Sequence, residues 1–135
     1  MHIDNKEQMK AWVLDFFKGL KVGSVVALDG DLGAGKTQMV QWIGRALGLE
    51  EAITSPTFDL IHRYETDQGP LYHLDLYRLE VPEEIEDLNY EEAFYPTEGW
   101  TFVEWPERAR DYLPPNTIWL SIQKGMGEER EVEVK

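Results

Sequence analysis

The sequence predicts an α/β fold, a mixed sheet with antiparallel hairpins and flanking helices. A glycine-rich loop at residues 30–37 separates a short apolar run from a segment with apolar residues at helical spacing. Elsewhere two pairs of strand-like runs, each joined by a turn, indicate hairpins. Because the chain has 135 residues, we expect a single domain over residues 1–135.

The N-terminal segment predicts an amphipathic helix. Asp4 and Glu7 have the spacing of a capping box. An apolar face follows, and it ends at Gly19 or Gly23. The residues of this face are Met9, Trp12, Val13, Phe16, Phe17 and Leu20.

The central unit of the sequence is a strand, a loop and a helix. Residues 24–28 predict a buried strand, and apolar residues recur at helical spacing from Met39 to Leu47, with Gly48 as a stop. Residues 30–37 fit the pattern G-x-x-x-x-G-K-[ST] at every fixed position. Loop N–H groups and a helix N-terminus together attract phosphate. We therefore predict a small P-loop NTPase-like domain; the alternative is a glycine-rich turn with a chance lysine.

The loop supplies most of the predicted cofactor-binding residues. Lys36 can reach the β- and γ-phosphates, which makes it a catalytic as well as a binding residue, and the Thr37 hydroxyl can bind Mg²⁺. The full predicted set is Asp31, Leu32, Gly33, Ala34, Gly35, Lys36, Thr37 and Gln38. The chain lacks a suitably placed N-K-x-D segment, which argues against recognition of guanine.

The two hairpins frame the rest of the chain. The first pairs a strand within residues 58–64 with one within 71–76, around a turn at 66–70. The second pairs residues 117–123 with 129–134 around Gly125 and Gly127. These pairings give the predicted sheet its antiparallel character.

Three shorter elements are expected between the hairpins. Pro82 can occupy the first turn of a short acidic helix that runs through Leu88. Residues 100–103 predict a strand that ends at Glu104, and a helical turn runs from Pro106 through Arg110.

Two carboxylates are candidates for chemistry beside the loop. A P-loop enzyme needs a second Mg²⁺ ligand, usually an acidic residue at the end of an apolar strand. Glu104 fits this position better than Asp75 does. Asp75, between Leu74 and Leu76, is a candidate to orient or deprotonate water. From the residues alone, it could equally be a structural partner of neighbouring basic groups.

A polar loop and two histidines are weaker candidates. Thr54, Ser55 and Thr57 could form a switch that senses the γ-phosphate through Mg²⁺. The residues alone favour a simple connecting turn. His62 and His73 lie on predicted hairpin strands, where packed or surface histidines are commoner than ligands.

Composition narrows the classes of function. The net charge of −13 argues against direct binding of nucleic acid, so we expect any link to RNA to pass through a partner. No cysteine and no apolar run of membrane-spanning length is present, which predicts a cytoplasmic protein without a membrane partner. We also expect the chain to be monomeric when alone. No arginine is an obvious finger, so intrinsic hydrolysis is expected to be slow until a partner completes the site.

Four segments in order resemble the TsaE family over nearly the whole chain. They are the glycine loop 30–37, the Thr-Ser-Pro-Thr-Phe run at 54–58, the His-x-Asp-x-Tyr-Arg-Leu run at 73–79 and the Val-Glu-Trp-Pro-Glu run at 103–107. The P-loop alone is widespread, whereas the four motifs together are specific. Gln38, where a second threonine is usual, and residues 89–90, where Gly-Leu is common, depart from the pattern.

The resemblance implies an ATPase needed for the threonylcarbamoyladenosine modification of tRNA, at the adenosine beside the anticodon. It implies ATP and Mg²⁺ as cofactors, Thr37 and Glu104 as metal ligands, and a catalytic role for Asp75. The segment near Asp4 is implied to lie beside the adenine. The implied partner is the TsaB–TsaD heterodimer, which ATP hydrolysis resets between turnovers, with tRNA reached only through that complex.

Two other functions use the same loop. A small-molecule P-loop kinase is one, although the chain lacks the arginine-rich lid that such enzymes use. The other is a nucleotide-gated assembly module, in which ATP occupancy matters and hydrolysis is not essential.

Overall fold

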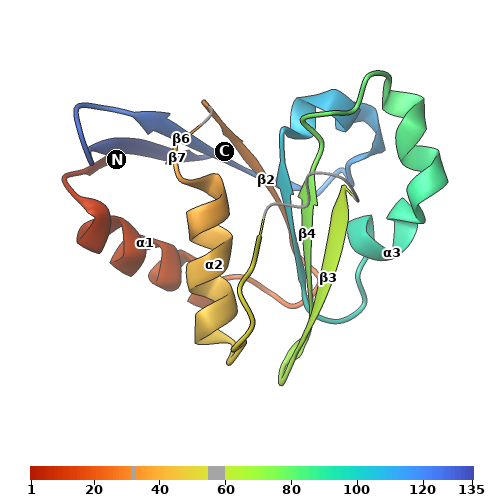
Figure 1. The fold of residues 1–135 in the computed structure, drawn as a ribbon, viewed down its shortest axis with the longest axis horizontal. Coiled ribbons are helices and arrows are strands. Elements are labelled where there is room, and N and C mark those ends of the chain that lie inside the picture. The colour runs from red at the N-terminus through yellow and green to blue at the C-terminus, as the bar shows by residue number, and fades with distance from the viewer. Residues whose placement is uncertain (32, 55–59) are drawn as a thin grey trace.

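The computed structural model describes residues 1–31, 33–54 and 60–135. Within these residues the chain forms one seven-stranded sheet in the order β1-β7-β6-β2-β5-β4-β3 (Figure 1). The strands are β1 His2–Ile3, β2 Val25–Gly30, β3 Ile61–Thr66, β4 Gly69–Asp75, β5 Trp100–Glu104, β6 Ile118–Lys124 and β7 Arg130–Val134. The helices are α1 Lys6–Lys18, α2 Lys36–Ala46 and α3 Tyr90–Phe94, with the 3₁₀ helices η1 Pro82–Leu88 and η2 Pro106–Tyr112.

The sheet is parallel at its centre and antiparallel at both margins. Strands β6, β2, β5 and β4 run parallel, whereas β1–β7, β7–β6 and β3–β4 pair antiparallel. The prediction of an α/β fold with a mixed sheet, two antiparallel hairpins and flanking helices is confirmed. The parallel centre places the carboxyl ends of β2, β4 and β5 along one edge of the sheet.

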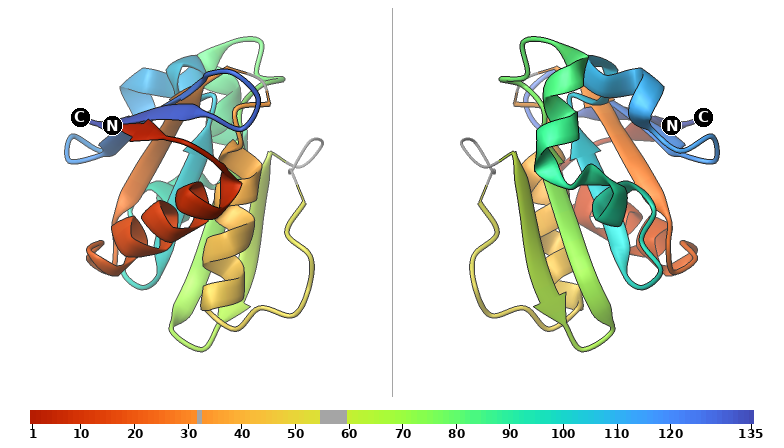
Figure 2. Two further views of the ribbon diagram at one scale, coloured as in Figure 1. Left: turned by 90° about the vertical axis from the view of Figure 1, so that its left-hand side faces the viewer. Right: turned by 90° about the vertical axis from the view of Figure 1, so that its right-hand side faces the viewer.

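Helices cover both faces of the sheet (Figures 1 and 2). Leu71 and Phe102 belong to the apolar core on the face of α1 and α2. Their neighbours Tyr72 and Val103 belong to the second core, with η1, α3 and η2. This alternation follows from the two-residue period of a strand. Because both faces are covered, the central strands are apolar nearly throughout.

The predicted start of α1 is wrong by one residue. The N-cap is Asn5, whose Oδ1 accepts from Gln8 N at 2.9 Å. Asp4 precedes the cap, and its N–H donates to Gln8 Oε1 at 3.0 Å. Asp4 follows β1 directly, so its backbone belongs to the strand-to-helix connection. An Asn-x-x-Gln pair therefore replaces the predicted Asp-x-x-Glu pair.

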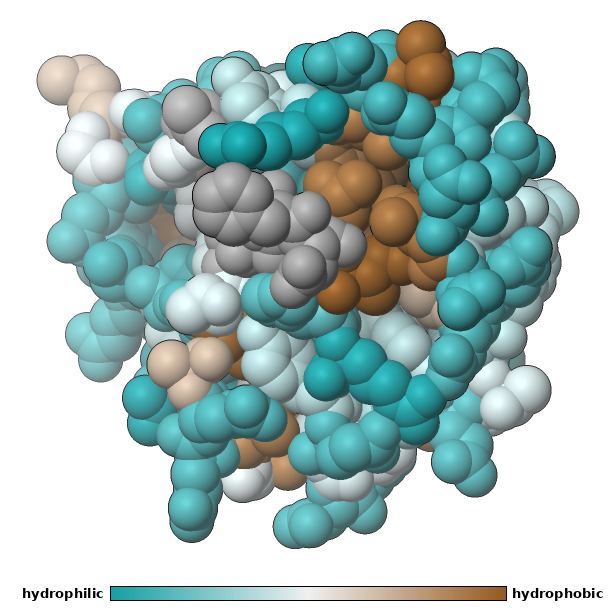
Figure 3. Space-filling view, turned by 45° about the vertical axis from the view of Figure 1, so that its right-hand side comes forward, coloured by the Kyte–Doolittle hydropathy of each residue, from teal (hydrophilic) through white to brown (hydrophobic). Residues whose placement is uncertain are grey.

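One face of the molecule is largely hydrophilic. The face shown in Figure 3 carries polar side chains nearly throughout, with one hollow in which apolar side chains are visible. Within the described part of the chain, no helix has both the length and the apolar character needed to span a membrane.

Candidate functional site

The predicted site residues of three distant segments meet at one edge of the sheet. Strand β2 ends at Gly30, β5 at Glu104 and β4 at Asp75. In the parallel register Asp75 lies opposite Glu104, and Leu28 of β2 lies opposite Glu104 on the other side. Helix α2 starts from the loop that follows β2, so its N-terminus lies at the same edge. Parallel strands thus collect carboxylates and a helix N-terminus in one place.

Two glycines allow the loop to take its path. A Cβ on Gly30 would lie 2.1 Å from the carbonyl oxygen of Ile122 on β6, so only glycine fits this approach. Gly35 is the N-cap of α2 with φ +107°, a left-handed conformation that disfavours side chains. A distant strand also contacts the loop, because Nε of Arg130, at the start of β7, donates to Ala34 O at 2.9 Å. The predicted ligand Leu32 lies outside the described residues.

Lys36 is buried against the loop and an aromatic ring. Its side chain is only 4% exposed, its Nζ donates to Gly30 O at 2.7 Å and lies 4.1 Å from the ring centroid of Trp105. Trp105 has φ +56°, which is unusual for a bulky residue, and backbone strain of this kind concentrates at functional sites. The loop lysine is therefore held by hydrogen bonding and by the face of the ring.

Thr37, Glu104 and His73 form a compact polar contact under the loop. Thr37 Oγ1 donates to Glu104 Oε2 at 2.8 Å. His73 Nε2 lies 2.5 Å from the same oxygen. His73 is fully buried and Glu104 is 4% exposed, so both groups rely on these contacts rather than on water.

The two predicted metal ligands suit Mg²⁺ in chemistry and spacing. Both offer oxygen, which Mg²⁺ prefers. Neighbouring ligands in an octahedron with Mg–O bonds of 2.0–2.1 Å are about 2.9 Å apart. Thr37 Oγ1 and Glu104 Oε2 are 2.8 Å apart, so they could share a metal with little rearrangement. That they bind the metal stays a prediction.

Asp75 lies in the cleft beside the loop. Its side chain is half-buried, and Oδ1 accepts from the N–H of Tyr77 at 3.0 Å. The cleft has a volume of about 460 Å³. Its lining residues are Gly33, Gly35, Lys36, Thr37, Gln38, Asp75, Tyr77, Arg78, Glu104 and Trp105. A phosphate chain in this cleft would face a lysine, a helix N-terminus and two carboxylates together.

A second recess lies on the other side of the loop. It has a volume of about 170 Å³ and shares Gly33, Gly35 and Gln38 with the cleft. Its other lining residues are Lys6, Met9, Ala34, Trp42, Glu128 and Arg130. Lys6 N donates to Glu128 Oε1 at 3.0 Å, which ties the start of α1 to the β6–β7 turn. The recess is therefore a mixed apolar and polar surface next to the predicted phosphate site.

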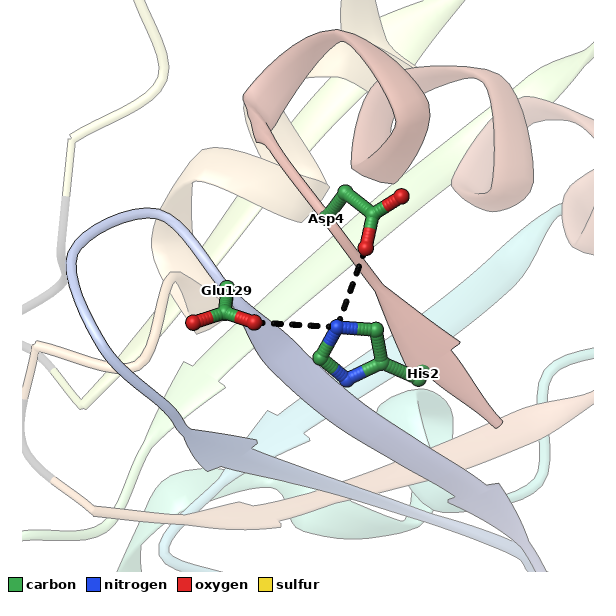
Figure 4. Close-up of side chains that lie close together, drawn as sticks. All are labelled: His2, Asp4 and Glu129. Atoms are coloured by element: carbon green, nitrogen blue, oxygen red, sulfur yellow. Dashed lines mark ion pairs between the residues drawn. The ribbon is translucent and has the colours of Figure 1, made fainter.

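A separate group of titratable side chains lies where β1 meets β7 (Figure 4). His2 Nε2 is 3.0 Å from Asp4 and 3.1 Å from Glu129, and its Nδ1 is 2.9 Å from Glu131. The hydrogen bond with Glu131 is the main cause that raises the pKa of His2, and the nearby carboxylate charges add to it. The group could hold a metal ion by spacing alone. Because His2 and Asp4 are exposed and Glu129 is partly exposed, surface ion pairs explain the arrangement fully, and we assign no metal to it.

The structure also locates the weaker candidates. Ser55 and Thr57 lie outside the described residues. The N–H of Thr54 donates to Tyr64 Oη at 3.4 Å. His73, interpreted from sequence as a packed or surface histidine, contacts Glu104. His73 and Asp75 are two residues apart on β4, so both side chains lie on the face of the sheet that carries Glu104. This spacing is the feature of the sequence that could have indicated the contact between His73 and Glu104.

A family model and several known proteins similar to this chain carry the same family description. The family described as "Threonylcarbamoyl adenosine biosynthesis protein TsaE" matches residues 3–132. A Nostoc sp. protein described as tRNA threonylcarbamoyladenosine biosynthesis protein TsaE is 46% identical over 118 residues, 85% of this chain and 72% of that protein. A Bacillus subtilis protein of the same description is 38% identical over 128 residues, 95% of this chain and 79% of that protein. The crystal structure of Bacillus subtilis YdiB matches with a TM-score of 0.79 and 31% identity, over 98% of this chain and 80% of that one.

Proposed function

The chain belongs to the TsaE family, and from that premise we propose that it is a Mg²⁺-dependent P-loop ATPase that serves the threonylcarbamoyladenosine modification of tRNA. The relatives' descriptions give the pathway. The ATPase activity is proposed from the site. The observation that supports it most is the 2.8 Å contact between Thr37 of the P-loop and Glu104 at the end of a parallel strand.

In the proposed complex the loop holds the phosphates of ATP. The backbone N–H groups of residues 33–38 and the N-terminus of α2 face the phosphate oxygens. Lys36 leaves Gly30 O and the ring of Trp105 and pairs with the β- and γ-phosphates. This exchange is favourable because a phosphate is a stronger partner for the buried ammonium than a carbonyl oxygen.

Thr37 and Glu104 are the proposed protein ligands of Mg²⁺. Mg²⁺ held there would neutralise negative charge that develops on the β- and γ-phosphate oxygens. Glu104 supplies an anionic oxygen from a rigid strand, and Thr37 supplies a neutral one from the first turn of α2. Because both side chains are anchored in regular structure, their oxygens need little ordering when the site fills.

Asp75 is the proposed residue that acts on the attacking water. The water oxygen forms a bond to the γ-phosphorus while the bond to the β–γ bridging oxygen breaks, which gives ADP and phosphate. Asp75 accepts a hydrogen bond from that water and orients it. The position of Asp75 opposite Glu104 in the strand register supports this role, since it places the carboxylate beside the proposed metal site.

The recess beside the loop is the proposed site of the adenine. Its Met9 and Trp42 offer apolar contacts, and Lys6 and Glu128 offer polar ones at its rim. Lys6 and Met9 lie in the first turns of α1, just after Asp4. This is close to the segment that the family resemblance places by the base.

The proposed partner is the TsaB–TsaD heterodimer, which hydrolysis resets between turnovers. An acidic surface with net charge −13 suits a protein partner better than a phosphate backbone. We therefore propose that tRNA is reached only through the complex. No arginine is assigned to the transition state within this chain, so turnover alone is expected to be slow.

The test is Mg²⁺-ATP turnover by this chain, alone and with TsaB–TsaD, compared with Asp75→Asn. We expect strong stimulation by the partner and its loss in Asp75→Asn, with ATP binding retained. Phosphate transfer to a small acceptor would instead identify a kinase. Modification that continues with Asp75→Asn, although hydrolysis is lost, would identify a nucleotide-gated assembly module.

A further inference from the structure

We infer that His73 is a positioning residue that fixes the Glu104 carboxylate toward Thr37 and thereby sets how tightly the chain holds Mg²⁺ with its nucleotide. The inference rests on the proposed function, because it gives a role to a residue behind the proposed metal ligand. It concerns a contact that neither the sequence motifs nor the family description assigns.

The contact crosses two neighbouring parallel strands. His73 lies on β4 opposite Phe102 of β5, and Glu104 is two residues further along β5. Side chains two residues apart point to the same face of a sheet. The His73 ring thus reaches diagonally along the sheet, and its Nε2 lies 2.5 Å from Glu104 Oε2.

Within the described part of the chain, one of the two ring nitrogens of His73 has a hydrogen-bond partner and the other has none. Among the described residues, Nδ1 of His73 is buried without one. A buried N–H without an acceptor is costly, so the ring proton is assigned to Nε2, where Glu104 accepts it. An apolar side chain would fill this core position without leaving an unsatisfied nitrogen. The contact with Glu104 therefore explains why an imidazole is present here.

His73 would remain as a hydrogen-bond donor to Glu104 when the Thr37 hydroxyl binds Mg²⁺. The Thr37 hydroxyl donates to Glu104 in this structure. When the Thr37 and Glu104 oxygens bind the same Mg²⁺ as neighbouring ligands, the O–H bond of Thr37 points away from the line between them. Glu104 would then keep His73 as its hydrogen-bond donor among the described contacts, and this donor lies on a rigid strand with a fully buried ring. Hydrogen bonds of this kind behind a metal ligand typically change metal affinity about 10- to 100-fold when removed.

The first experiment assigns the ring proton in the wild-type chain. Nitrogen-15 NMR of labelled histidine distinguishes a protonated Nε2 from a protonated Nδ1. We expect His73 to carry its proton on Nε2. A ring with its proton on Nδ1 could not donate to Glu104, and that result would overturn the inference without any mutation.

The second experiment compares His73→Gln with His73→Asn by calorimetric titration with ADP, in Mg²⁺ and in EDTA. The glutamine amide ends near the position of Nε2, whereas the asparagine amide ends near Nδ1. We expect His73→Asn to weaken ADP binding about 10- to 100-fold in Mg²⁺, with affinity in EDTA unchanged. His73→Gln should recover most of the loss. His62→Gln, on the strand paired with β4 and directly opposite His73, is the matched control.

The outcomes separate this inference from the proposed function. Equal weakening with and without Mg²⁺ would make His73 merely structural, and no weakening at all would also overturn its positioning role. If wild-type binding does not depend on Mg²⁺ and Glu104→Ala changes nothing, the proposed function itself fails. If Glu104→Ala removes the Mg²⁺ dependence while His73→Asn behaves as wild type, only the inference fails. Should His73→Asn not fold, His73→Leu provides the same comparison without a donor.

Discussion

Two histidine–carboxylate contacts in this chain use the same groups in opposite surroundings. His73 meets Glu104 inside the sheet, with one nitrogen engaged and no exposed area. His2 meets Asp4, Glu129 and Glu131 at the surface where β1 joins β7, with its side chain 48% exposed. The first contact is directional and shielded from water. The second is a diffuse set of charges that water and salt can screen.

The difference leads us to expect functional contacts where polar groups are buried, rather than where carboxylates are most numerous. Three acidic groups surround His2, yet any of them can be replaced by water at little cost. Among the described residues, His73 has a single hydrogen-bond partner, Glu104, which also accepts from Thr37. Burial keeps both His73 and Glu104 away from water. A search for clustered acidic residues would select the exposed group first. Among the described residues, the buried pair of His73 and Glu104 lies instead at the edge of the sheet that holds the loop.

Removing Glu104 should have the largest effect of any single change. Glu104→Ala is expected to lower Mg²⁺-dependent ATP turnover at least about 100-fold, because the metal contributes several kcal/mol of charge stabilisation. It also leaves His73 Nε2 and Thr37 Oγ1 without their partner, which lowers the free energy of unfolding by about 1–3 kcal/mol. Initial rates and urea unfolding measure the two effects. The exposed Glu107→Ala is the control, and normal turnover in Glu104→Ala would exclude Glu104 from the metal site.

Lys36→Ala should give the next largest effect, on binding. Removing a buried charged partner of phosphate costs about 2–4 kcal/mol, so ATP affinity is expected to fall about 30- to 700-fold. Calorimetric titration with ATP, in EDTA and in Mg²⁺, measures the loss, which should occur in both conditions. The exposed Lys10→Ala is the control for net charge. Unchanged affinity in Lys36→Ala would mean that phosphates bind elsewhere.

A smaller effect is expected at Thr37, and it sharpens the assignment of the metal ligands. Thr37→Val removes the hydroxyl with little change of shape, whereas Thr37→Ser keeps it. We expect Thr37→Val to raise the Mg²⁺ concentration for half-maximal turnover about tenfold and Thr37→Ser to change it little. Magnesium titrations of the initial rate measure both. Equal behaviour of the two variants would remove the hydroxyl from the proposed metal site.

The smallest effect is expected at His2, and it depends on pH. The Glu131 hydrogen bond and the charges of Asp4, Glu129 and Glu131 raise the pKa of His2 above 6.5. A raised pKa in the folded state stabilises the fold below pH 6.5, and this contribution is lost as the pH rises through the folded value. Unfolding of wild type and His2→Gln at pH 5.5 and pH 8.5 should therefore differ only at the lower pH. High salt should reduce that difference, and one that persists at pH 8.5 would contradict the assignment.

Local patterns in the sequence predicted the elements that carry the proposed chemistry. The loop, its flanking strand and helix, and the strand ending at Glu104 each follow from spacing within about ten residues. The hairpin strands follow from alternation and turn residues, and β3 runs from Ile61 to Thr66. Residues 58 and 59 of the predicted strand lie outside the described part of the chain. Helix α3 and strand β1 were not predicted, because five and two residues are too few to show a period.

Contacts between distant strands could not be predicted in the same way. The order of the sheet places β5 between β2 and β4, which local patterns do not encode. That order decides which carboxylates meet, and it brings His73 to Glu104. The contact of Arg130 with Ala34 O depends on the same long-range packing, since 96 positions separate the two residues. The motifs thus indicated the candidate site residues, whereas the strand order of the sheet determines which of them are in contact.

The position of Lys36 over Trp105 gives the protein an optical reporter of its own. An ammonium group 4.1 Å from an indole ring perturbs the energy of its excited state, so departure of the lysine toward a phosphate should change the emission of Trp105. Four other tryptophans (Trp12, Trp42, Trp100 and Trp119) would obscure that signal, and a chain that keeps Trp105 alone would isolate it. Stopped-flow fluorescence of such a chain could then time the arrival and release of nucleotide, without any dye attached to either molecule.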